Sequence, residues 1–84
     1  MTRKELVTSL QKIVKPYAQN QEAFKNLSEG TDFINDLEIN SANLVDVILD
    51  VEDEFGIEID NESMEKMLSV KSSIDIIETK LAET

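Results

Sequence analysis

The sequence predicts an all-α protein, a small four-helix bundle of three main helices and one short helix with a long first loop. Two observations lead to this class. Apolar residues recur at three- and four-residue spacing in three stretches, the pattern of helices that bury one face. Residues that favour helix N-termini stand before these stretches, whereas only residues 57–59 alternate as a strand would. At 84 residues the chain has room for one domain, expected to span residues 1–84.

The first main helix is expected over residues 3–18. Thr2 and Glu5 have the spacing of a capping box, in which each side chain accepts a hydrogen bond from the other residue's backbone N–H. Pro16 lacks the N–H that a helix interior needs, so the helix is predicted either to bend there or to end earlier. The apolar side of this helix consists of Leu6, Leu10, Ile13, Val14 and Tyr17.

Residues 19–35 break the helical pattern and make a connection that is long for so small a domain. Such loops are usually functional or held down by their own side chains. Phe24, Leu27 and Phe33 are the candidates for holding this one, and a short helical turn fits residues 22–26. Leu37 is expected to fold inward with Phe33 under the next helix, because burying both enlarges a small core.

The second main helix is expected over Ser41–Phe55, capped by Asn40 or Ser41 and ended by Gly56. Its apolar sector consists of Leu44, Val47, Ile48, Val51 and Phe55. The opposite side is lined by Asp46, Asp50 and Asp53. Leu49 falls among these carboxylates, which predicts an exposed leucine.

The remaining chain is expected to form a connector and two helices. Residues 57–59 are interpreted as an extended connector that buries Ile57 and Ile59. Asp60 or Asn61 then caps a short helix, with Met64, Met67 and Leu68 on one face. Ser69 caps the last main helix, whose apolar positions are Val70, Ile74, Ile77 and Leu81.

Composition excludes several classes of function. The chain has no cysteine and no histidine, so it lacks disulfides, thiolate metal ligands and the commonest general base. No catalytic residue and no metal ligand is therefore assigned. The net charge is −10, and thirteen carboxylates without a lysine or arginine lie between Asn26 and Glu65. This field repels nucleic acid and anionic membranes and attracts basic protein surfaces. No apolar run approaches the length of a membrane span and no signal-peptide core is recognised, so with the absence of cysteine we expect a cytoplasmic protein that does not insert into membranes, and a monomer.

The acidic block suggests a calcium site, which the spacing rejects. An EF-hand loop needs oxygen ligands at positions one, three and five and glycine at six. With Gly56 at position six, these positions hold Val51, Asp53 and Phe55, so two of the three fail.

Ser41 stands where a polar turn meets a helix N-terminus. Free backbone N–H groups and the helix dipole stabilise an anion there, so a phosphate ester on its hydroxyl is physically sensible. A plain helix cap fits the same position, and position alone does not separate the two.

The chain resembles the acyl carrier protein family over essentially its whole length, without gaps from Phe33 onward. Each short motif is weak alone, but their joint order is specific. The residues that carry the resemblance are Phe33, Asp36-Leu37, Ser41 five residues after Asp36, Glu52-Asp53-Glu54-Phe55, Ile59, Glu65-Lys66-Met67, Ser69-Val70 and Ile74-Asp75.

The resemblance implies a carrier that does no chemistry of its own. A phosphopantetheinyl transferase would attach a 4'-phosphopantetheine arm from coenzyme A to Ser41, and the thiol of the arm would carry acyl groups as thioesters. The acyl groups would pass between acyl ligase or synthase enzymes of fatty acid, polyketide or related biosynthesis. Positions that would meet basic docking patches on these enzymes are Asn40, Ala42, Asp46, Leu49, Asp50, Glu52 and Asp53.

One departure from the family concerns Asn40-Ser41-Ala42, which stands where the family usually has Asp-Ser-Leu. The missing carboxylate would weaken metal-assisted loading, and the missing leucine removes an apolar partner contact. We expect a working carrier with its own transferase or pathway rather than a degenerate one. The competing hypotheses are a carrier-like interaction module that is never loaded and a helical protein that binds divalent cations. The acyl cargo stays open.

Overall fold

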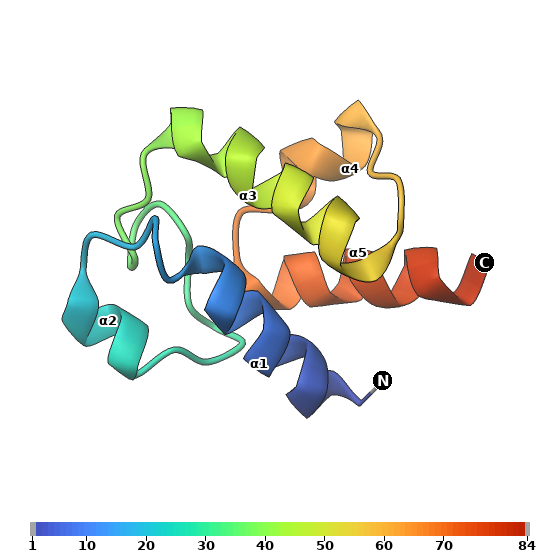
Figure 1. Ribbon diagram of the computed structural model, residues 1–84. Coiled ribbons are helices and arrows are strands. Elements are labelled where there is room, and N and C mark those ends of the chain that lie inside the picture. The colour runs from blue at the N-terminus through green and yellow to red at the C-terminus, as the bar shows by residue number, and fades with distance from the viewer. Residues whose placement is uncertain (1, 84) are drawn as a thin grey trace.

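The computed structural model describes residues 2–83, and their secondary structure consists of helices without a strand. The helices are α1 (Arg3–Val14), α2 (Gln21–Lys25), α3 (Ser41–Phe55), α4 (Asn61–Lys66) and α5 (Val70–Glu83). α1 packs against both α3 and α5, and α4 packs against α5. In Figure 1, α2 lies at the left, away from α4 and α5 at the right. The predicted all-α bundle is confirmed.

The start of α1 is as predicted, but its end is not. Glu5 N–H donates to Thr2 Oγ1 at 3.2 Å and Thr2 N–H donates to Glu5 Oε1 at 3.0 Å, which completes the capping box. The helix ends at Val14 instead of residue 18. Pro16 cannot donate the hydrogen bond that would continue the helix, so the chain turns there, as the alternative of an earlier end anticipated. Within α1, Leu6, Leu10 and Val14 are buried.

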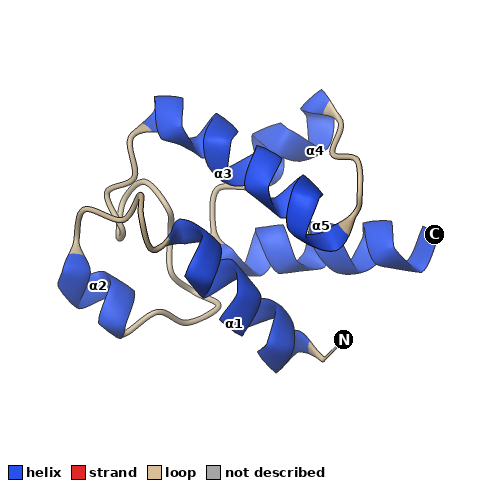
Figure 2. Ribbon diagram, viewed as in Figure 1, coloured by secondary structure: helices blue, strands red, loops and turns tan. Residues whose placement is uncertain are grey.

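The long loop between α1 and α3 contains a helix of its own. The expected turn is the five-residue α2, which Asn20 caps by accepting a hydrogen bond from Ala23 N–H at 3.1 Å. Figure 2 shows long irregular connections on both sides of α2. Phe33 is buried as predicted, whereas Phe24 and Leu27 are only partly buried.

The second half of this loop is fixed to the start of α5 by backbone hydrogen bonds. Phe33 N–H donates to the Leu68 carbonyl at 2.9 Å, and Val70 N–H donates to the Thr31 carbonyl at 3.0 Å. Between them lies an isolated antiparallel bridge that pairs Asp32 with Ser69. The loop is therefore held by main-chain pairing as well as by apolar side chains.

Buried apolar residues from every long helix and from the connections form one core cluster. Ile57 and Ile59 are buried as predicted, so the connector after α3 seals the bundle. The cluster consists of Leu6, Leu10, Val14, Ala18, Phe33, Leu37, Ile39, Leu44, Val47, Ile48, Val51, Ile57, Ile59, Met67, Val70, Ile74 and Ile77.

The prediction that Met64, Met67 and Leu68 share one face of a short helix is wrong for Leu68. Met67 is buried and Met64 partly buried, but Leu68 is 46% exposed. α4 ends at Lys66, so Leu68 lies in the bend after it and no longer follows the helical repeat. Its backbone carbonyl is used in the pairing with the loop, while its side chain faces solvent.

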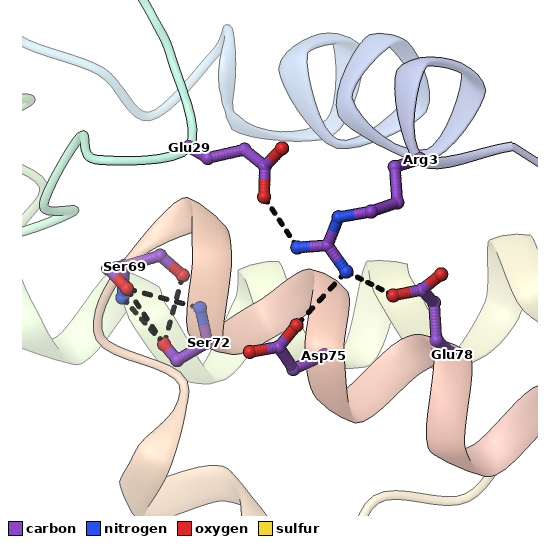
Figure 3. Close-up of polar contacts among 6 residues, drawn as sticks. All are labelled: Arg3, Glu29, Ser69, Ser72, Asp75 and Glu78. Carbon is purple, nitrogen blue, oxygen red and sulfur yellow. Dashed lines mark hydrogen bonds and ion pairs between the residues drawn. The ribbon is translucent and has the colours of Figure 1, made fainter.

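Side-chain hydrogen bonds and ion pairs fix the first half of α5 and connect it to α1 and to the loop (Figure 3). Ser72 N–H donates to Ser69 Oγ at 3.2 Å and Ser69 N–H donates to Ser72 Oγ at 3.1 Å, so Ser69 caps α5 as predicted. Arg3, which the sequence marked only as the first residue of a helix, pairs with Glu29 in the loop and with Asp75 and Glu78 on α5. Hydrogen bonds to Glu29 and Asp75 raise the pKa of Arg3 above its ordinary value. One guanidinium thus joins α1, the loop and α5.

The orientation of α3 can be tested with two valines of the same helix. Val51 is 0% exposed and Val45 is 48% exposed. We expect Val51→Ala to lower the free energy of unfolding by about 2 to 3 kcal/mol, because it leaves a cavity in the core. Val45→Ala should change it by less than about 0.5 kcal/mol, as exposed positions do. Urea unfolding followed by circular dichroism measures both, and equal losses would mean that α3 is rotated from this position.

Candidate functional site

Ser41 is the first residue of α3, and its hydroxyl is not used to cap the helix. Asn40 makes the cap instead, because its Oδ1 accepts a hydrogen bond from Ala42 N–H at 2.9 Å and its carbonyl accepts one from Asn43 N–H at 2.8 Å. This decides between the two caps that the sequence allowed. The Ser41 side chain is exposed, and among residues 2–83 no hydrogen bond involves its Oγ.

The loop before Ser41 is held in one shape by the residues on either side of Glu38. Leu37 and Ile39 are both buried, and Ile39 N–H donates to the Phe33 carbonyl at 2.9 Å. Glu38 between them has φ +56°, a left-handed conformation that is unfavourable for a residue with a side chain. Burying both neighbours offsets that local cost. The result is a fixed approach of the chain to the N-terminus of α3.

The first turn of α3 carries no acidic residue, although the rest of the helix is rich in them. Asn40, which stands where the usual motif has aspartate, and Asn43 provide neutral amides at this end of the helix. The partial positive charge of the helix N-terminus is therefore not offset by a nearby carboxylate in this turn.

The outer face of α3 presents apolar and acidic side chains together. Leu49 is 50% exposed, as predicted, and Asp46, Asp50 and Asp53 are exposed around it. Val45, one helical turn before Leu49, is 48% exposed and was not singled out from the sequence. Among the ion pairs of residues 2–83, none involves α3.

Glu52 differs from the other acidic residues expected to meet partners. It is partly buried, and its Oε2 accepts a hydrogen bond from Ile59 N–H at 2.7 Å. This bond fixes the connector against the end of α3. Glu52 therefore has a structural role that its sequence position did not reveal.

Tyr17 adds a group to this face that sequence analysis missed. Its hydroxyl donates a hydrogen bond to Asp50 Oδ2 at 3.1 Å. The sequence placed Tyr17 only in the apolar stripe of the first helix, and the local pattern holds no signal for a polar contact with a residue so far along the chain. Partial burial, followed by the hydrogen bond and negative charge of Asp50, raises the pKa of the Tyr17 phenol.

In residues 2–83, no group of three or more His, Cys, Asp or Glu side chains is placed to hold a metal ion. In the same residues, none of the helices combines the length and apolar character needed to cross a membrane.

Curated proteins give a consistent comparison, although no protein-family model matches the chain. The chain is 35% identical over 81 residues to an acyl carrier protein of Coprothermobacter proteolyticus, covering 96% of both chains. It is also 35% identical over 80 residues to an acyl carrier protein of Lactobacillus acidophilus, covering 94% of this chain and 96% of that one. The chain belongs to the acyl carrier protein family.

Solved structures of acyl carrier proteins share its fold. The crystal structure of the acyl carrier protein of Thermotoga maritima matches with a TM-score of 0.80 and 30% identity, covering 96% of this chain and 92% of that one. The acyl carrier protein of Enterococcus faecalis matches with a TM-score of 0.76 and 29% identity, covering 95% and 99%. The family resemblance that the sequence motifs indicated is thereby confirmed, together with the helical bundle and the carrier role.

The contact between Tyr17 and Asp50 predicts a pH dependence. The pKa of Tyr17 is raised in the folded protein, so the protonated phenol stabilises the fold relative to the unfolded chain. This contribution to the free energy of unfolding is complete below the ordinary tyrosine pKa of 10.0 and is lost as pH rises through the raised pKa. Tyr17 is the only tyrosine, so absorbance near 295 nm follows its titration alone. Asp50→Asn should shift the titration to lower pH, whereas Asp53→Asn on the same helix should leave it close to wild type. No shift in Asp50→Asn would contradict the contact.

Proposed function

We propose that the chain carries acyl groups as thioesters on a 4'-phosphopantetheine arm attached to Ser41. The observation that carries this proposal is the free, exposed Ser41 hydroxyl at the N-terminus of α3, with Asn40 making the cap. A serine needed for capping would be a poor acceptor, because its modification would disturb the helix. Here the hydroxyl can be esterified without the loss of a cap.

The residues around Ser41 fit the phosphate of such an arm. A phosphodiester there meets the positive end of the helix dipole, and the first turn of α3 has no carboxylate to repel it. The arm would supply the thiol that a chain without cysteine lacks. The protein itself would hold and present the acyl group, and we assign it no catalytic residue.

We further propose that the outer face of α3 binds the enzymes that use the carrier. Its acidic residues and exposed Leu49 suit a phosphopantetheinyl transferase, and acyl ligase or synthase enzymes, with basic docking patches. Asp46, Leu49, Asp50 and Asp53 supply the exposed contacts, and Asn40 and Ala42 lie beside the serine. Glu52 contributes its charge while its carboxylate also holds the connector. A cytoplasmic location and a monomeric state stay predictions from the sequence.

Loading of Ser41 is tested directly by mass spectrometry. Incubation with coenzyme A, magnesium and a broad-specificity phosphopantetheinyl transferase should add one arm to the wild-type protein and to Ser28→Ala, but none to Ser41→Ala. If wild type stays unloaded, Asn40→Asp combined with Ala42→Leu should restore loading, since these changes recover the usual motif. If neither this variant nor protein from the native host ever carries an arm, the carrier proposal fails and an unloaded docking module takes its place.

Docking through α3 is tested with two leucines of similar exposure. Leu49→Ala should raise the KM for loading and change the free energy of unfolding by less than about 0.5 kcal/mol, because the side chain is half exposed. Leu68→Ala, on the bend after α4, should leave the KM unchanged. Charge reversal at Asp46 and Asp53 should slow association and weaken its dependence on salt. If Leu49→Ala unfolds the protein, the residue belongs to the core and this interface is wrong.

A further inference from the structure

Tyr17, from another part of the chain, borders the outer face of α3 that we propose as the docking surface. Tyr17 lies in the turn after α1, where Pro16 precedes it and its N–H donates to the Val14 carbonyl at 2.9 Å. Its ring packs partly against the core cluster, and its hydroxyl reaches across to Asp50 on α3. The ring is therefore held at the border of the acidic face, with limited freedom to move away.

Three groups meet at this border. Asp50 receives the Tyr17 hydroxyl on Oδ2, so the orientation of its carboxylate is set from outside α3. Asp46, one helical turn earlier, is close enough for its charge to act on the phenol as well. Both carboxylates are exposed, and neither is paired with a cation of the described chain. The exposed Val45 and Leu49 lie on the other flank of Asp46.

The chemistry of this border selects among basic side chains. A lysine ammonium is a compact charge that would serve either carboxylate. An arginine guanidinium is planar, donates two parallel hydrogen bonds to a carboxylate and stacks on an aromatic ring. A lysine can also contact the ring, but only the guanidinium can lie flat on it while donating two parallel hydrogen bonds to a carboxylate.

We propose that the border formed by Tyr17, Asp46 and Asp50 receives an arginine side chain of a partner enzyme, its guanidinium against the Tyr17 ring and bonded to the carboxylates. This inference rests on the proposed docking function of α3. It extends the docking surface onto the turn after α1 and gives it a preference for arginine over lysine. The charge of the partner follows from complementarity, since the chain carries a net −10 and α3 holds no basic residue.

The alternative is that the Tyr17 hydroxyl only ties α1 to α3. If Tyr17 has only this structural role, its ring does not contribute to the binding of a partner on α3. The two roles differ in the effect of removing the ring and in the response of the ring itself to binding. Both effects can be measured separately from folding.

The experiment uses two amphipathic helical peptides without aromatic residues, identical except that three arginines in one are lysines in the other. Calorimetry at low ionic strength should show the arginine peptide binding wild type about 2- to 5-fold more tightly than the lysine peptide. Tyr17→Leu should abolish this preference, and Tyr17→Phe should retain it because the ring remains. The experiment uses the unloaded protein, so a failure of loading would not affect this result.

A second readout does not depend on any Tyr17 variant. The chain has one tyrosine and no tryptophan, so its intrinsic fluorescence reports Tyr17 alone. The arginine peptide should change this fluorescence with the same midpoint as the calorimetric titration. The proposal is overturned if the arginine peptide does not bind, if the two peptides bind equally, or if binding leaves the fluorescence unchanged. Retention of the preference by folded Tyr17→Leu would overturn it as well.

Discussion

The buried stripe of α3 determines what this protein presents to other molecules. Leu44, Val47, Ile48 and Val51 are buried in the core, and α3 packs against α1. Because a helix turns through a fixed angle per residue, burying these positions leaves the carboxylates and Leu49 on the opposite side. The same packing fixes the N-terminus of the helix, and with it the position of Ser41. Docking face and attachment residue are thus set by one packing interaction.

Features that depend on local signals could be predicted from the sequence. The bounds of α3, its stop at Gly56 and the capping box of α1 follow from residue spacing and capping chemistry. The exposure of Leu49 could be predicted for the same reason, because it needs only the helical period. The exposure of Leu68 could not be predicted in this way. α4 ends at Lys66 because the chain bends there to pair its backbone with the loop at Phe33, and the helical repeat does not encode that pairing.

Contacts between distant segments could not be predicted in this way. The sequence predicts Arg3 only as the first residue of a helix, but its guanidinium forms ion pairs with Glu29 in the loop and with Asp75 on α5. Glu52 reads as one more acidic residue of the outer face, yet it fixes the connector. Tyr17 reads as an apolar position, yet its hydroxyl reaches α3. Each role depends on which segments fold together, and one sequence without structure holds no periodic or spacing signal for that.

The bridge between the loop and the start of α5 has a consequence for the order of folding. Helical contacts close over four residues, whereas the pairing of Asp32 with Ser69 joins the two halves of the chain. The entropy of closing so long a segment must be lost before the pairing gives any stability. We therefore expect the loop that leads to Ser41 to take its final shape only after the start of α5 has come into place. Ser41 would then reach its final position only once the two halves of the chain have come together.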